Sequence, residues 1–203
     1  MYTYIRLTVV IVLFFIEIYL QSKSKIKKWG RKYIFWTMIF NLLFLLLLGF
    51  MPVEKLFLRF DSPNEAYEYT NSADILLTVD GNESTFVIGE SKDAINHLIV
   101  PKSENDSWKI GIITDIKRVQ SNLYENASIN IYRYNNSQDY YIELISLQPG
   151  NVDVSDSLGT DFLSLEREVG PDGETYVIYY AFLDNLPDSY KVTIGGNVIN
   201  LFD

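Results

Sequence analysis

The chain has 203 residues, with 17 lysine and arginine side chains against 26 aspartate and glutamate, one histidine and no cysteine. Without cysteine the chain has neither a disulfide scaffold nor a thiol nucleophile, and one histidine is too few for a histidine-based zinc site.

The charges divide unevenly at Leu58. Residues 1–58 carry 8 basic and 2 acidic side chains (net +6), whereas residues 59–203 carry 9 and 24 (net −15). Such an asymmetry indicates two parts in different physical environments. The strongly negative larger part would repel phosphates, so we expect no nucleic-acid partner.

Residues 33–51 read YIFWTMIFNLLFLLLLGFM, a stretch of 19 residues without a formal charge. At about 1.5 Å per residue this length spans roughly the 30 Å of a bilayer's hydrocarbon, so we predict a transmembrane helix here. A second apolar stretch covers residues 7–20, and adding residues 2–5 across Arg6 extends it to spanning length. We therefore predict another transmembrane helix over about residues 3–20.

The segment 21–32 between these helices is basic, and the positive-inside rule predicts that it is a cytoplasmic loop. Both ends of the chain would then face outward. The alternative is a cleaved secretory signal, because Arg6 precedes an apolar run, although no small-x-small cleavage site precedes Gln21. The six cations of the loop are Lys23, Lys25, Lys27, Lys28, Arg31 and Lys32.

Two polar residues fall inside the predicted spans. Glu17 lies near the cytoplasmic end of the first helix, where we expect it to snorkel or be protonated. Asn41 lies near the middle of the second, where an amide usually hydrogen-bonds a neighbouring helix. An ion path lined by both is the alternative, but two helices are too few to enclose one.

A short helix is predicted soon after Pro52, where the chain leaves the bilayer. Ser62 is a preferred N-cap residue, Pro63 suits the first helical position, and Glu65 stands three residues after the cap. This capping box predicts a helix from Pro63 to about Tyr69.

The pattern F-x-S-P-x-x-A-[FY]-x-Y, at residues 60–69, resembles the start of small membrane-anchored envelope proteins of Gram-positive bacteria. Residues 98–110 and 155–162 look like the same proteins, and residues 179–196 are similar to the closing strands of an immunoglobulin-like sandwich. The resemblance implies an envelope location and an immunoglobulin-like fold, without an activity.

The rest of the chain alternates short apolar runs with turn residues, which is typical of an all-β domain. The pairs Asp80-Gly81 and Gly195-Gly196 and the segment 170–173 predict hairpin turns. Residues 176–180 are apolar on both faces and predict an internal strand, and a two-layer sandwich would bury such strands. The predicted strands cover residues 74–78, 85–89, 94–100, 108–113, 117–124, 127–134, 140–147, 162–168, 174–183, 191–194 and 197–201.

His97 is the chain's only imidazole and lies in a predicted strand. A serine hydrolase would need such a base, but no G-x-S-x-G elbow accompanies it. We therefore interpret His97 as an exposed or half-buried strand residue.

Carboxylates are the remaining candidates for chemistry. Glu166 and Glu168 share one predicted strand face, and Asp153, Asp156 and Asp161 cluster in a loop. The first arrangement is compatible with a glycosidase pair and the second with calcium. An acidic surface produces such pairs by chance, and the loop lacks the EF-hand spacing, so solvated surface residues are the favoured interpretation.

The sequence thus predicts a membrane protein, with a two-helix transmembrane hairpin in residues 1–58 and an extracytoplasmic, all-β, sandwich-like domain with one short leading helix in residues 59–203. We expect an interaction or binding module of the cell envelope, in contact with the lipid bilayer and with another envelope protein or a wall component. We expect no catalysis, cofactor or metal. The alternatives are a wall-active hydrolase that uses paired carboxylates and an accessory subunit of a membrane complex.

Overall fold

The computed structural model divides the chain into two compact units, Met1–Phe57 and Leu58–Asp203. In the second unit it describes all residues except 93, 104–106, 111–115, 126, 136, 149, 170–173 and 203. In the first unit it describes residues 8, 11, 12, 14–16, 18, 19, 36 and 38–43.

The described residues of the first unit are helical. Within the part of the chain that the structure describes, no helix has both the length and the apolar character needed to cross a membrane. Asn41 is helical and half-buried. Glu17 and the six cations of the predicted loop lie outside the described residues, as do most residues of the two predicted spans.

The second unit begins with the predicted capped helix, α3 (Pro63–Thr70). Ser62 is its N-cap, with an extended backbone (φ −144°, ψ 156°), and its Oγ accepts a hydrogen bond of 3.2 Å from the N–H of Glu65. The Glu65 carboxylate accepts from the N–H of Asp61 at 3.1 Å, one residue earlier than in a standard capping box. The cap is therefore present, with its returning bond shifted by one residue.

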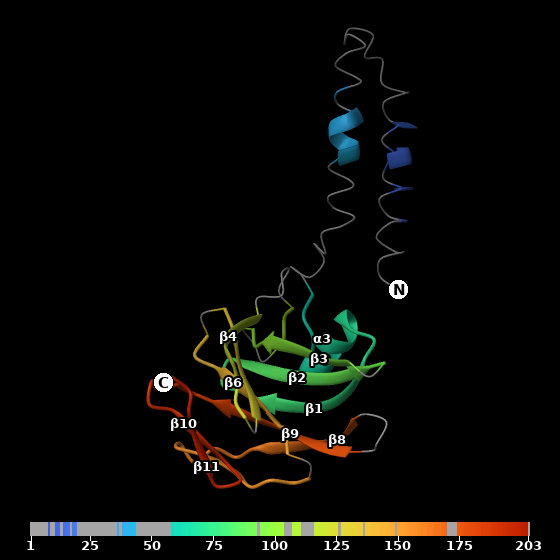
Figure 1. Ribbon diagram of the computed structural model, residues 1–203. Coiled ribbons are helices and arrows are strands. Elements are labelled where there is room, and N and C mark those ends of the chain that lie inside the picture. Colours follow the sequence, from blue (N-terminus) through green and yellow to red (C-terminus); the bar gives the residue numbers. More distant parts are fainter. Residues whose placement is uncertain are drawn as a thin grey trace. The chain divides into compact units, whose positions relative to one another are not determined.

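The strands of this unit form three antiparallel sheets (Figure 1). The first has the order β1 (Asp74–Asp80), β2 (Ser84–Ser91), β3 (Ala94–Pro101). The central sheet has the order β4 (Ile116–Leu123), β5 (Ala127–Tyr134), β6 (Tyr140–Ser146), β9 (Glu174–Leu183), β8 (Leu163–Val169). The third has the order β11 (Asn197–Asn200), β10 (Lys191–Ile194), β7 (Val154–Asp156).

The all-β prediction is confirmed, and so is the internal position of residues 176–180, because β9 lies between β6 and β8. The run 108–113 is not a strand in its described residues, where Trp108 forms only isolated bridges to Phe60 and Lys102. The three-residue strand β7 was not predicted. The Gly195-Gly196 turn joins β10 to β11 with φ values of 54° and 84°, a left-handed backbone that glycine adopts without strain.

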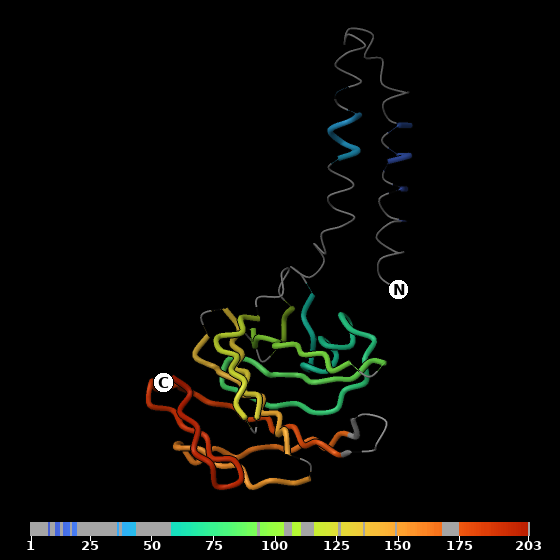
Figure 2. Tube along the Cα trace, viewed as in Figure 1, coloured from blue at the N-terminus to red at the C-terminus, as the bar shows by residue number. Residues whose placement is uncertain are grey.

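The central strands β5, β6 and β9 are largely buried on both faces, so the unit has more layers than the predicted two. On one face Ile129 and Leu144 pack with Val192 of β10. On the other face Tyr141 and Tyr180 pack with residues of β2, including Phe86. Figure 2 shows the green trace of the first sheet above the red trace of β10 and β11. Additional layers form because alternate residues of β5, β6 and β9 are apolar or aromatic on both faces.

The helix α3 covers the outer face of the first sheet. Ala66 and Tyr67 are fully buried there and pack in one cluster with Val87 and Leu98. Gly89 is required under the helix, because a Cβ at this position would clash with the Tyr67 hydroxyl. This close approach fixes how α3 docks.

Candidate functional site

A groove of about 640 Å³ opens in the second unit over the central sheet, beside β3. Its size falls in the usual range of small-molecule sites. The residues that line it come from β3, all five strands of the central sheet and the segment after β6. They are Ile95, His97, Arg118, Asn130, Tyr132, Glu143, Ile145, Leu147, Arg167, Tyr176 and Ile178.

The pleat of the central strands places these side chains. Successive residues of a strand point to opposite faces, so Asn130 and Tyr132 of β5 share one face while the intervening isoleucine enters the core on the other. Glu143 and Ile145 of β6 face the groove for the same reason. The strand register places Asn130 opposite Glu143, and Glu143 opposite Tyr180.

Glu143 is the centre of a buried polar cluster, which we call the Glu143 cluster and define as His97, Asn130, Tyr132, Glu143 and Tyr180. Asn130 Nδ2 donates to Glu143 Oε2 at 2.8 Å, and the Tyr132 hydroxyl donates to the same oxygen at 3.0 Å. The Tyr180 hydroxyl donates to Oε1 at 3.2 Å. His97 Nε2 lies 2.9 Å from Oε1, an ion-pair distance without the alignment of a good hydrogen bond. Both carboxylate oxygens therefore have two close partners.

His97 links two sheets, since it belongs to β3 and Glu143 to β6. Its side chain is 19% exposed and that of Glu143 is 5% exposed. The imidazole also stacks on Phe86, with 5.3 Å between the ring centroids. His97 was predicted to be an exposed or half-buried strand residue, and it is a half-buried residue of β3, but the sequence did not indicate its acidic partner.

The cluster keeps one negative charge and two neutral tyrosines. Burial raises the pKa of Glu143, but the adjacent His97 and the hydrogen bonds from Asn130 and Tyr132 lower it by a larger amount, so the net pKa lies below its ordinary value. Burial, followed by the charge of Glu143, raises the pKa of Tyr132 to about 12. The same two causes raise the pKa of Tyr180. At neutral pH these tyrosines are donors rather than nucleophiles.

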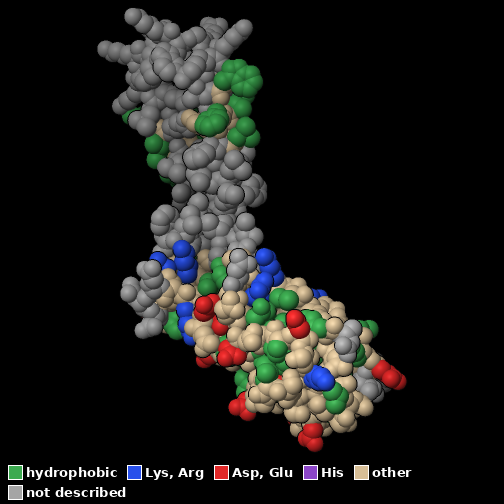
Figure 3. All heavy atoms as spheres, turned by 90° about the vertical axis from the view of Figure 1, so that its left-hand side faces the viewer, with side chains coloured by type: hydrophobic (Ala, Val, Ile, Leu, Met, Phe, Trp, Pro, Cys, Tyr) green, Lys and Arg blue, Asp and Glu red, His purple; other side chains and the backbone are tan. Residues whose placement is uncertain are grey.

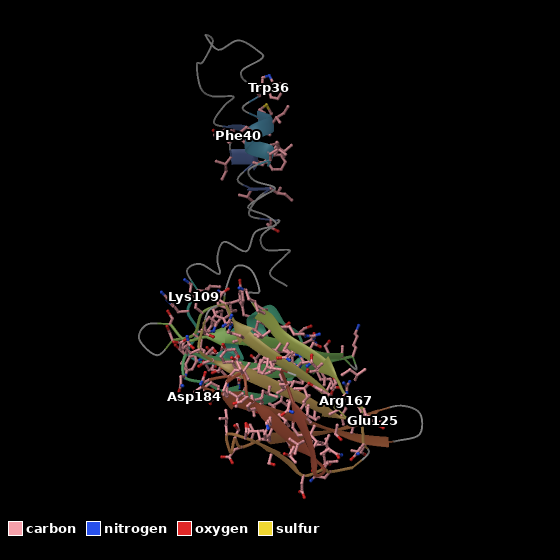
Figure 4. The ribbon with its side chains drawn as sticks, turned by 60° about the vertical axis from the view of Figure 1, so that its left-hand side comes forward. Trp36, Phe40, Lys109, Glu125, Arg167 and Asp184 are labelled. Atoms are coloured by element: carbon pink, nitrogen blue, oxygen red, sulfur yellow. The ribbon has the colours of Figure 1, made fainter. Side chains whose placement is uncertain are left out.

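Two arginines approach the groove from the two edge strands of the central sheet. Arg118 of β4 is exposed, its Nη2 donates to the Tyr132 hydroxyl at 3.3 Å, and its Cζ lies 5.5 Å from the centre of that ring. Arg167 of β8, labelled in Figure 4, forms an ion pair of 3.0 Å with Glu90 of β2.

The carboxylates that the sequence singled out lie elsewhere. Asp156 stabilises its own loop and holds Tyr190. Its Oδ1 accepts from the backbone N–H groups of Leu158 at 3.0 Å and Thr160 at 2.8 Å, and its Oδ2 accepts from the Tyr190 hydroxyl at 2.7 Å. Burial raises the pKa of Asp156, but the hydrogen bonds from Thr160, Tyr190 and Leu158 lower it by a larger amount. The net pKa therefore lies below its ordinary value.

The other predicted carboxylates do not form a site either. Asp153 and Asp161 are exposed, and Glu166 is exposed on β8. The side chain of Glu168 lies outside the described residues. Within the described part of the chain, no group of three or more histidine, aspartate and glutamate side chains has a geometry that could hold a metal ion.

A second buried acid, Asp139, was also missed by the sequence reasoning, and its role is structural. Its carboxylate accepts from the N–H of Glu83 at 2.7 Å and from the Ser84 hydroxyl at 2.9 Å. These bonds tie the β1–β2 turn to the β5–β6 loop. A Cβ at Gly81 would approach Asp139 Oδ2 to 2.6 Å, so this turn requires glycine.

No protein-family model, no curated protein and no solved structure matches this chain. The resemblance to envelope proteins stays an expectation, and the groove is the feature from which a function can be inferred.

Proposed function

We propose that this protein is a membrane-anchored binding module of the cell envelope, whose β-rich unit faces outward and binds its ligand in the groove. The uncharged segment 33–51 and the basic segment 21–32 support the anchor and its orientation. The groove of about 640 Å³, with its Glu143 cluster, is the single observation that carries the binding function.

Binding has better support than hydrolysis because of how the groove is lined. Glu143 is the one carboxylate among the described lining residues, and side chains of the two sheets lie within hydrogen-bond or ion-pair distance of both its oxygens. A glycosidase needs two carboxyl groups that flank the bond to be cleaved. The described lining offers one, and that one is engaged in holding the sheets together.

The orientation is tested by proteolysis of intact protoplasts. We expect the protease to remove the unit that follows Phe60 while the preceding segments stay in the membrane fraction. Protection of this unit until the cells are lysed would mean that it faces the cytoplasm, and the envelope proposal would then be wrong.

The groove is tested by placing a photo-crosslinking amino acid at Leu147 in the full chain and irradiating intact cells. Leu147 lines the groove and is 42% exposed. Val198 of β11 is the matched control, an apolar side chain 62% exposed and outside the lining. We expect a specific adduct from position 147 and none from position 198. An adduct only from the helical residue Leu43, 55% exposed, would favour the accessory-subunit alternative.

A further inference from the structure

We infer that the groove takes a small amphipathic anion, a molecule with an apolar body and one carboxylate or phosphate group. This inference rests on the proposed binding function and names the class of ligand. It follows from the charge of the lining, from the state of Glu143 and from the character of the remaining wall.

The charge balance of the groove is opposite to that of the unit around it. Residues 59–203 contain 24 acidic and 9 basic side chains, and Figure 3 shows acidic side chains spread over one face of this unit. The groove is lined by two of the basic side chains, Arg118 and Arg167, and by one acidic side chain, Glu143. The formal charges of these three side chains sum to +1. An excess of positive charge in a concave site attracts anions.

Glu143 is not available to bind a positively charged ligand. Its oxygens have partners at 2.8 to 3.2 Å, and its side chain is 5% exposed. A cationic ligand would have to displace these partners and would still meet the two arginines. The arginines, rather than the buried acid, therefore set the sign of the ligand.

Arg118 is the residue placed to meet the anion. It is exposed, and Tyr132 orients its guanidinium by accepting a hydrogen bond at 3.3 Å. Tyr132 is in turn held by Glu143 at 3.0 Å. A guanidinium has five donors in a fixed fork that suits carboxylate and phosphate, and orientation before binding lowers the entropic cost of association. Arg167 already pairs with Glu90, so we assign it the supporting role.

The rest of the wall requires an apolar body. Ile95, Ile145, Leu147, Tyr176 and Ile178 supply most of the remaining lining. A bare inorganic anion would leave this surface in contact with water, and a neutral apolar molecule would cover Arg118 without a partner for its charge. A molecule with both parts satisfies both kinds of surface.

The experiment is calorimetric titration of the full chain in lipid nanodiscs, with empty nanodiscs as the blank. The probes are phenylbutyrate, its neutral amide, and dihexanoyl phosphatidate. We expect the anions to bind about tenfold or more tightly than the amide, because a charge-assisted hydrogen bond contributes ~1.5 to 3 kcal/mol, at least one decade of affinity. Tighter binding of phosphatidate would identify a lipid as the source of the anion, and tighter binding of phenylbutyrate a free carboxylate.

Three variants at two neighbouring β4 residues show whether Arg118 is responsible. Arg118→Gln should reduce anion affinity to that of the amide, while Arg118→Lys should retain part of the preference. Lys117→Gln is the matched control, because Lys117 is exposed on the same strand, carries the same charge and is outside the lining. An unchanged melting temperature shows that each variant folds.

Three results would overturn the inference: equal affinity for anion and amide, an equal loss in the Lys117 and Arg118 variants, or no binding of any probe. The binding function itself is judged separately, by the crosslinking at Leu147. A specific adduct at that position together with equal affinities would keep the binding module and reject only the anionic ligand.

Discussion

Replacing Glu143 by glutamine tests the interpretation of the cluster most directly. Glutamine keeps the size of the side chain and one acceptor oxygen, but its amide nitrogen faces donors that previously met an acceptor. Either the pair on Oε1, His97 and Tyr180, or the pair on Oε2, Asn130 and Tyr132, then loses its acceptor.

Each unmet buried donor costs ~1 to 3 kcal/mol, so two of them lower the free energy of unfolding by about 3 kcal/mol, with partial relief where a hydroxyl can rotate. We expect urea unfolding of the full chain, followed by circular dichroism at the sheet band, to show this loss. Glu166→Gln is the control, because Glu166 is exposed on β8. A loss below ~1 kcal/mol, or one equal to that of the control, would refute the account of the cluster.

We also expect the difference in unfolding free energy between the wild type and Glu143→Gln to depend on pH. The pKa of Glu143 is lowered in the folded state, so its ionised form stabilises the protein above the unfolded pKa of about 4.3. This contribution is lost as the pH falls through the folded pKa, which lies lower still. We therefore expect the difference in unfolding free energy between the wild type and Glu143→Gln to shrink as the pH drops below about 4.3. A difference that grows on acidification would mean that the direction of the shift is wrong.

Three further substitutions can be measured in the same unfolding assay. Ser62→Ala should lower the unfolding free energy by about 1 kcal/mol, since the N–H of Glu65 loses its acceptor, and an unchanged stability would show that the cap contributes nothing. Tyr67→Phe should leave stability unchanged or raise it by about 1 kcal/mol, because this buried hydroxyl has no hydrogen-bond partner among the described residues, and a clear loss would reveal one. Tyr179→Ala should cost about 4 kcal/mol, as it empties part of a core in which the ring is 5% exposed and removes the bond to Val152; a cost near 1 kcal/mol would place Tyr179 outside the core.

The strands were predictable from the sequence because their side chains alternate with period two and because the turns between them use glycine, asparagine and aspartate. The predicted bounds of β5, β9 and β10 coincide with those of the structure. The helix α3 was predictable from local chemistry alone, since Ser62 and Pro63 act within one turn. In each of these cases the determining interactions lie within a few residues along the chain.

The layers and the site depend on contacts between distant segments, which periodicity does not specify. His97 and Glu143 are 46 positions apart and belong to different sheets. Of the carboxylates that attracted attention in the sequence, Asp153, Asp161 and Glu166 are exposed, whereas Asp156 accepts hydrogen bonds within its own loop and from Tyr190. The useful signal was a single glutamate in the apolar run YYIELIS of β6, because a charge inside such a run is either misplaced or paired.

Pairing β5 with β6 as a hairpin predicts one of the contacts in the Glu143 cluster. Asn130 stands directly opposite Glu143 in that hairpin, so an amide donor was available beside the acid. What the hairpin does not reveal is the packing of β3 over this face, which adds His97 and closes the buried side of the cluster. The groove therefore becomes visible only when both sheets are placed.

The position of Glu143 also bears on why a carboxylate stands there at all. Moving a carboxylate out of water costs several kcal/mol, and well-packed apolar side chains often stabilise such an interface as well as an ion pair does. Stability alone therefore gives weak grounds for an acid between these sheets. Glu143 also orients other side chains. It accepts a hydrogen bond of 3.0 Å from the Tyr132 hydroxyl, and that hydroxyl accepts one of 3.3 Å from Arg118. A buried negative charge thus orients an exposed positive one, and the lining gains a cation with a defined direction in a unit that is otherwise strongly acidic.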